Sequence, residues 1–186
     1  MERHKILIVD DEPHILSLLK KILEEGNREV LTAKSAEEAW QLLKEKGEVG
    51  VIICDHRLPN MSGVDFLVKV KRLYPDTIRI LVTGYPEIST AVEAINKAHI
   101  WRYILKPIDV DNLKILIKQA FEYYRILKEN RLLLKIARQQ KEWIEAMKKE
   151  FPEIINQKLN ESSSELDEKK MTEIIEEFTK RYYNQK

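Results

Sequence analysis

The chain has 186 residues, of which 34% are charged, and its acidic and basic side chains nearly cancel to a net charge of +1. This balance excludes a general electrostatic attraction to nucleic acid, and it excludes the acidic excess of many disordered chains. Cys54 is the one cysteine, so no intrachain disulfide is possible, and no apolar stretch reaches the roughly 18 residues of a membrane span. Without a signal-peptide core, we expect a cytoplasmic protein that neither enters the membrane nor binds nucleic acid directly.

Short apolar runs alternate with amphipathic segments along the first part of the chain. The first run, residues 5–9 (KILIV), predicts a strand. Three acids follow it: Asp10, Asp11 and Glu12. Pro13 suits the first turn of a helix and Gly26 suits its end. The apolar face expected for this helix is Ile15, Leu18, Leu19, Ile22 and Leu23.

A weaker strand is expected at residues 29–33 (EVLTA). Ser35, followed three residues later by Glu38, is a capping-box signature that opens the next helix. The residues expected inside this helix are Ala39, Leu42 and Leu43. Gly47 and Gly50 bracket the turn that leads to the third strand.

Residues 51–54 (VIIC) are wholly apolar, which is typical of a central strand covered on both faces in a parallel sheet. Asp55 follows at the carboxyl end of this run, where open α/β sheets place their ligands. Asp55 is therefore the candidate reactive group; the alternative is a loop aspartate that caps a helix near Ser62. The apolar residues of that helix, which stops before Pro75, are Val64, Phe66, Leu67 and Val70.

The fourth strand is expected at residues 78–82 (IRILV), which end at Thr83 and Gly84. Residues 86–97 predict a helix, with inward residues Ile88, Val92 and Ile95. The fifth strand is expected at residues 100–105 (IWRYIL), before Lys106 and Pro107. Five alternations with short connections predict an α/β fold, a doubly wound parallel sheet with right-handed crossovers. The sequence has no glycine-rich dinucleotide or P-loop fingerprint, which removes the main support for nucleotide binding.

The last helix, from near Asp109 to about residue 150, contains no Gly or Pro. A seam spaced by three and four residues predicts a coiled coil; the alternative is a long helix packed on its own domain. The seam is Tyr123, Ile126, Asn130, Leu133, Ala137, Gln140, Ile144, Met147 and Phe151. We expect a domain at 1–125, an extended helix at 126–151, and a helical tail at 152–186 that is too small for an output domain.

Distinctive polar residues end four of the predicted strands: Asp10 and Asp11, Asp55, Thr83, and Lys106 with Pro107. In a parallel sheet these ends meet at one edge. Three carboxylates there repel each other unless a cation intervenes, and their hard oxygens suit Mg²⁺. With the metal bound, Asp55 can attack a phosphoryl group, Lys106 can hold a phosphoryl oxygen and Thr83 can reach the acyl phosphate.

The motifs VDDEP, ICDHRLPNMSG, VTG and YILKP, in this order, resemble the receiver (response regulator) domain of two-component signalling. The resemblance covers about residues 5–128 and implies a five-stranded sheet in the flavodoxin-like order 2-1-3-4-5. It implies that Asp55 accepts phosphate from a sensor histidine kinase, as a switch rather than a turnover enzyme. The implied metal-binding groups are Asp10, Asp11, Asp55 and the backbone carbonyl of Arg57.

The resemblance also implies that Thr83 and Tyr103 are the switch residues and that Lys106–Pro107 is a cis peptide bond. The segment NKAHIWRY departs from the usual Gly-Ala pair before Tyr103, and the tail has no recognisable output module. We therefore expect output through protein interactions, on the face formed by helix 4, strand 5 and helix 5, and through a homodimer of the extended helix.

Three alternatives remain open from the sequence. A non-phosphorylated scaffold is opposed by the complete set of acids, Thr83 and Lys106. A haloacid-dehalogenase-type phosphatase places a second acid two residues after its nucleophile, where this chain has Arg57. The third alternative is that the chain is the receiver and linker part of a longer regulator.

The receiver geometry that the resemblance implies predicts that Arg57 and Tyr85 flank the path of the water that hydrolyses the acyl phosphate. Long side chains there cover the phosphoryl group, and Arg57 can pair with its oxygens, which predicts slow self-dephosphorylation. The alternative is that both side chains lie in solvent or pack against the helix after Pro86.

Overall fold

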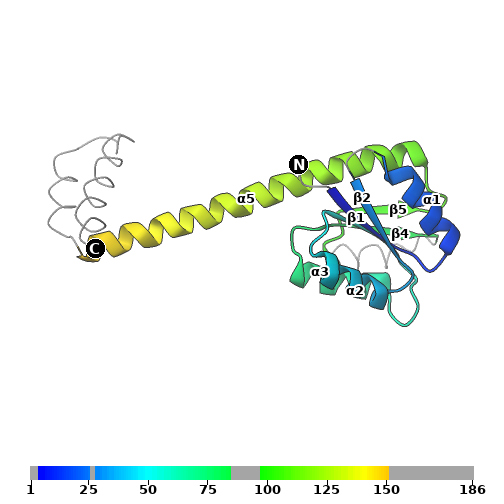
Figure 1. The fold of residues 1–186 in the computed structure, drawn as a ribbon, viewed down its shortest axis with the longest axis horizontal. Coiled ribbons are helices and arrows are strands. Elements are labelled where there is room, and N and C mark those ends of the chain that lie inside the picture. Colours follow the sequence, from blue (N-terminus) through cyan, green and yellow to red (C-terminus); the bar gives the residue numbers. More distant parts are fainter. Residues whose placement is uncertain (1–3, 26–27, 85–96, 151–186) are drawn as a thin grey trace. The chain divides into compact units, whose positions relative to one another are not determined.

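The computed structural model describes residues 4–25, 28–84 and 97–150. It contains a five-stranded sheet in which all neighbouring strands are parallel, in the order β2-β1-β3-β4-β5 (Figure 1). The strands are β1 His4–Val9, β2 Arg28–Ala33, β3 Val51–Asp55, β4 Ile78–Thr83 and β5 Arg102–Leu105. The predicted fold class and strand order are confirmed.

Helices cover both faces of this sheet (Figure 1). The helices are α1 Pro13–Leu23, α2 Ala36–Lys46, α3 Gly63–Leu73 and α5 Val110–Glu150. The helix expected at 86–97 lies almost wholly outside the described residues. None of the helices that the structure describes combines the length and the apolar character that crossing a membrane requires.

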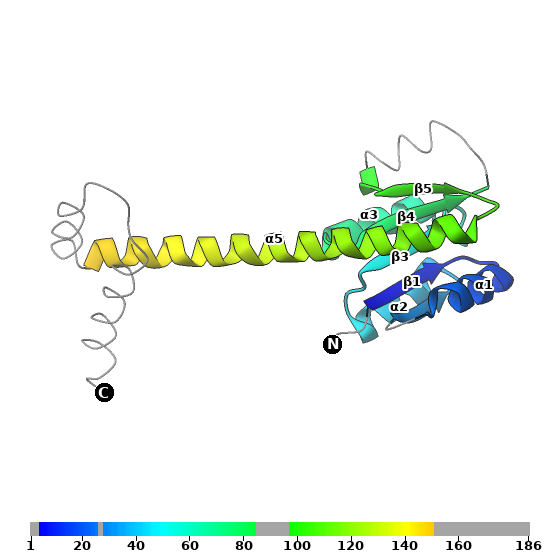
Figure 2. The ribbon, with the colours of Figure 1, turned by 90° about the horizontal axis from the view of Figure 1, so that it is seen from above.

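The sheet divides the core into two layers because alternate side chains of a strand point to opposite faces. Leu7 and Ile52 pack with α2 and α3, whereas Ile8 and Ile53 pack with α1 and α5. The first part of α5 runs along the same face of the sheet as α1 (Figure 2). The central strand β3 is buried along its whole length, as its apolar sequence predicts.

Two helix starts follow the local signals in the sequence. The Ser35 side chain accepts a hydrogen bond from the Glu38 backbone N–H, and the Glu38 carboxylate accepts one from Lys34 N–H. Ser62 likewise caps α3 by accepting from Asp65 N–H. The apolar residues predicted for α3 are all buried: Val64, Phe66, Leu67 and Val70.

The structure corrects the apolar face predicted for α1. Leu16, Leu19 and Leu23 are buried, whereas Leu18 is half exposed. The buried residues recur at three and four residues on one side of the helix, and Leu18 lies about 100° away from Leu19. The helix also ends at Leu23, before the glycine expected to end it.

The fifth strand begins at Arg102 rather than at residue 100. His99 has a positive φ of 47°, so the backbone turns just before this point. Ile100 is buried in the core without joining the strand, and Trp101 N–H donates to Arg79 C=O. The apolar run at 100–105 therefore includes two residues, Ile100 and Trp101, that precede the paired residues of β5.

The last helix is continuous for 41 residues. The Asp109 side chain accepts hydrogen bonds from the N–H groups of Asp111 and Asn112, which fixes its start. Its first part is buried against the sheet through Leu113, Ile117 and Ala120. The boundary between the two units of the chain lies within α5, between Leu132 and Leu133.

Candidate functional site

Asp55 is the last residue of β3, and its side chain is buried at the carboxyl edge of the sheet. The Arg57 backbone N–H donates a hydrogen bond of 2.6 Å to the Asp55 carboxylate. The chain then folds back sharply, because Gly63 N–H donates to His56 C=O at 2.8 Å. This tight return holds the carboxylate at the end of the central strand.

Asp10 lies beside Asp55 because β1 and β3 pair in parallel with Val9 opposite Cys54. Its carboxylate is buried and accepts a hydrogen bond from the Glu12 backbone N–H at 2.9 Å. Burial raises the pKa of Asp10, and this effect exceeds the lowering by its hydrogen bonds to Glu12 N–H and Lys106.

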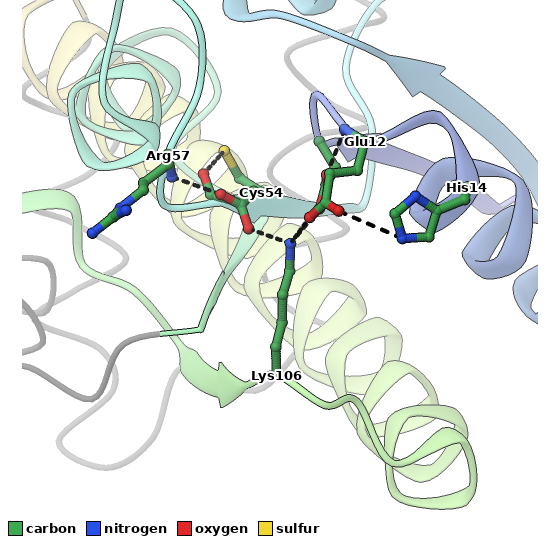
Figure 3. A network of polar contacts seen from close by, with 7 residues as sticks. Glu12, His14, Cys54, Arg57 and Lys106 are labelled. Carbon is green, nitrogen blue, oxygen red and sulfur yellow. Dashed lines mark hydrogen bonds and ion pairs between the residues drawn. The ribbon is translucent and has the colours of Figure 1, made fainter.

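Lys106 follows β5, and its backbone N–H donates to Thr83 C=O at 2.8 Å. Its ammonium lies 2.8 Å from an Asp55 oxygen and 3.0 Å from an Asp10 oxygen. It also lies 3.2 Å from a Glu12 oxygen (Figure 3). Partial burial lowers the pKa of Lys106, but hydrogen bonds with Asp55 and Asp10 outweigh burial, so its pKa is raised and the side chain stays charged.

The other predicted residues are placed as follows. Thr83 is buried at the end of β4, opposite Leu105 in the ladder. Tyr103 is half-buried in β5 and packs against the layer that contains α2 and α3. Asp11 and Arg57 are exposed. The Lys106–Pro107 peptide bond is cis, and Tyr85 lies outside the described residues.

Glu12 is the site residue that sequence reasoning missed. It is visible in the sequence only as the third acid after β1, and nothing local shows that its side chain reaches Lys106, 94 positions away. Gly63 was also missed as a site residue, although it approaches the Asp55 backbone closely. Both roles depend on the tertiary structure.

The donor chemistry of this edge fits a divalent cation. Asp10 and Asp55 present carboxylate oxygens to one positive group, and hard oxygens are the ligands that Mg²⁺ prefers. Within residues 4–25, 28–84 and 97–150, however, no group of three or more acidic, histidine or cysteine side chains is arranged to hold a metal ion. The predicted third acid, Asp11, is exposed in this geometry.

Cys54 packs beneath the site without a chemical role in it. The thiol is fully buried, and it contacts the carbonyl oxygens of Asp55 and Gly63. Burial raises the pKa of this thiol well above its ordinary value, and the nearby Asp55 raises it further. Because the thiolate is the reactive form, the residue behaves as a small core side chain.

A family model described as the response regulator receiver domain matches residues 6–118. Among curated proteins, the hydrogenase transcriptional regulatory protein HoxA of Bradyrhizobium diazoefficiens is 42% identical over 125 residues, which are 67% of this chain and 25% of that protein. The response regulator protein PilR of Pseudomonas aeruginosa is 34% identical over 120 residues, 64% of this chain and 26% of that protein. The chain thus spans about a quarter of the length of these relatives.

Two solved structures share the arrangement of the strands and helices. A CheY-like response regulator receiver domain from Methanospirillum hungatei has a TM-score of 0.63 and 34% identity, and the match covers 67% of this chain and 98% of that one. The beryllofluoride-activated NtrC4 receiver domain dimer has a TM-score of 0.60 and 39% identity, over 65% of this chain and 98% of that one.

Proposed function

The chain belongs to the response regulator receiver domain family, and on that premise we propose that Asp55 is its phosphoacceptor residue. The observation that carries the proposal is the Lys106 ammonium, which lies within 3.0 Å of both Asp55 and Asp10 at the carboxyl edge of the sheet. A buried carboxylate beside a fixed cation is suited to phosphoryl transfer, which depends mainly on positioning and charge stabilisation.

In the proposed reaction, an Asp55 carboxylate oxygen attacks the phosphorus of a phosphohistidine on a sensor kinase. The new O–P bond forms as the P–N bond breaks, and the kinase histidine leaves with the electron pair. The Arg57 N–H and Lys106 fix the orientation of the Asp55 carboxylate before attack. Lys106 then shifts its contact toward a phosphoryl oxygen.

We assign the binding of Mg²⁺ to Asp10, Asp11, Asp55 and the Arg57 backbone carbonyl. Bound there, the ion supplies positive charge that offsets the negative charge of the transferring phosphoryl group. The buried carboxylates of Asp10 and Asp55 support this assignment, since two close negative charges are stabilised by a cation. Asp11 follows β1 two residues after its last residue, and its side chain is exposed.

The proposed output is a change of protein contacts. The Thr83 carbonyl accepts a hydrogen bond from Lys106 N–H. Thr83 and Tyr103 on β5 are assigned as the residues that transmit phosphorylation to the β5–α5 surface.

Arg57 and Tyr85 are assigned to shield the acyl phosphate from water. HoxA is by name a transcriptional regulatory protein, and the match covers a quarter of its length.

The test is labelling with acetyl phosphate and Mg²⁺, followed by intact mass. We expect one added phosphate that hydroxylamine removes, and no added phosphate in Asp55→Asn, which lacks the nucleophile. Asp111→Asn, an equal change at an exposed position on α5, is the matched control and should be labelled like the wild type. A label that persists in Asp55→Asn, or that forms fully in the presence of a chelator, contradicts the assignment.

A further inference from the structure

The three N–H donors of the Lys106 ammonium have three carboxylate partners. Two of them, Asp10 and Asp55, are buried, with side chains 4% and 9% exposed. The third, Glu12, is 47% exposed and lies 3.2 Å from the ammonium. The family assignment accounts for Asp10, Asp55 and Lys106, but it gives no task to Glu12. The donors of Lys106 are thus fully used before any phosphoryl group arrives.

The backbone of Glu12 is fixed from both sides. Its N–H donates to the Asp10 carboxylate, and its C=O accepts from the N–H groups of Ile15 and Leu16. Glu12 occupies the N-cap position of α1, where a side chain ordinarily bonds to the first turn of the helix. It makes no such cap bond. One oxygen of its side chain instead contacts Lys106, and the other lies 3.5 Å from Nε2 of the exposed His14 in the first turn of α1 (Figure 3).

We propose that Glu12 is a positioning residue for Lys106, which holds the ammonium when Asp55 is unphosphorylated and competes with the phosphoryl group for it. The inference rests on the proposed phosphorylation of Asp55. Because Asp55 becomes an acyl phosphate, Lys106 must turn from the Asp55 oxygen toward a phosphoryl oxygen, and its contacts with Asp10 and Glu12 oppose this movement. Asp10 is buried and loses much of its charge compensation if Lys106 leaves it. Glu12 is half exposed, so water replaces the contact at small cost.

Glu12 therefore acts on the position of the ammonium rather than on its charge. The raised pKa of Lys106 comes from its hydrogen bonds to Asp55 and Asp10, which are the buried partners. Competition from Glu12 makes the phosphorylated state form more slowly and decay sooner than it would with a neutral side chain at position 12. Exposed ion pairs are weak, so we expect effects of about threefold in rate.

The experiment compares Glu12→Gln, Glu12→Asp and Glu25→Gln in the full chain. Glu25→Gln is the control, because it removes an equal charge from an exposed pair with Lys114. With acetyl phosphate at fixed Mg²⁺, we expect Glu12→Gln to be labelled about threefold faster and to lose its label about threefold more slowly. Glu12→Asp keeps the charge but is one methylene shorter, and it should resemble Glu12→Gln. Rates equal to the control, or a wild-type rate in Glu12→Asp, overturn the proposal.

A second measurement needs no phosphorylation. The side-chain ammonium signal of Lys106, assigned by its loss in Lys106→Arg, should shift in Glu12→Gln and stay in place in Glu25→Gln. An unchanged signal in Glu12→Gln overturns the positioning role even if Asp55 is labelled normally. Failure of the wild type to take any label contradicts the proposed function instead, whatever the lysine signal shows.

Discussion

Gly63 begins α3 against the end of the strand that carries Asp55. A Cβ atom at this position would collide with the Asp55 carbonyl oxygen and lie 3.0 Å from its carbonyl carbon. It would also lie 3.1 Å from the Cys54 sulfur. These neighbours are backbone and core atoms of the central strand, so they cannot move aside as a flexible surface side chain does. The missing side chain is what allows α3 to start next to the site.

Replacing Gly63 by alanine should push Asp55 out of place. We expect Gly63→Ala to lower the free energy of unfolding by about 1–3 kcal/mol, the usual range for overpacking, and to slow labelling of Asp55. Urea unfolding and acetyl phosphate labelling measure the two effects. Gly84→Ala is the control, because a Cβ there meets nothing within 4 Å. Equal stability in the two variants would show that the Asp55 backbone tolerates the methyl group.

The sequence predicted the positions of those candidate site residues that come directly after an apolar run. Asp10, Asp55 and Lys106 each end an apolar run, and the parallel sheet brings such ends to one edge. Glu12 and Gly63 could not be predicted in the same way. The reach of one side chain and the approach of one backbone to another are tertiary facts that no local pattern encodes.

At the scale of elements, α5 is held to the amino-terminal edge of the sheet by two ion pairs. Lys128 contacts Glu48 at 2.6 Å, and Arg131 contacts Asp76 at 2.8 Å. The two basic residues lie three positions apart, on one side of the helix. Asp76 is buried, so losing its contact with Arg131 should cost more than losing an exposed ion pair.

The two ion pairs should contribute unequally to stability. We expect Arg131→Gln to lower the free energy of unfolding by about 1–2 kcal/mol, below the cost of breaking a fully buried pair because Arg131 is half exposed. Lys128→Gln should cost less than about 1 kcal/mol, as for an exposed pair. Urea unfolding, with a double-mutant cycle between Asp76→Asn and Arg131→Gln, measures the coupling. Equal losses in both variants would contradict the special role of Asp76.

Most elements were predictable because local signals agree with the tertiary structure. Caps at Ser35 and Ser62 and the apolar run of β3 each determine an element locally. The predicted face of α1 was wrong at Leu18, since several leucines lie in a row and tertiary packing selects among them. The start of β5 was also misplaced, because a buried residue such as Ile100 resembles a strand residue in sequence.

For the whole molecule, α5 exposes large apolar side chains beyond its buried first part. Tyr123, Ile126 and Leu133 are exposed and belong to the predicted coiled-coil seam. Leu132 and Leu134 are also exposed and lie beside it, so the apolar surface is wider than one seam. Exposed apolar surface of this kind is typical of an interface. A second copy of the chain, paired through α5, is the partner we propose.

The pairing can be tested with a chain that ends at Leu132. This end keeps the Arg131–Asp76 ion pair, which a chain ending at Lys128 would lose. We expect the full chain to be a dimer by light scattering and the shortened chain to be a monomer that is still labelled at Asp55. The apolar seam residues that remain, Tyr123 and Ile126, offer too short a seam for a stable coiled coil.

A pair of charge substitutions separates the seam from the rest of the helix surface. Leu133→Lys and Gln139→Lys each add one positive charge to an exposed position of α5, but only Leu133 belongs to the seam. Leu133→Lys also removes an apolar side chain that is 62% exposed and available to a partner. We expect it to weaken association by about tenfold, or roughly 1.4 kcal/mol, while Gln139→Lys changes little. A monomeric full chain, or equal weakening by both substitutions, would show that this seam does not join two copies.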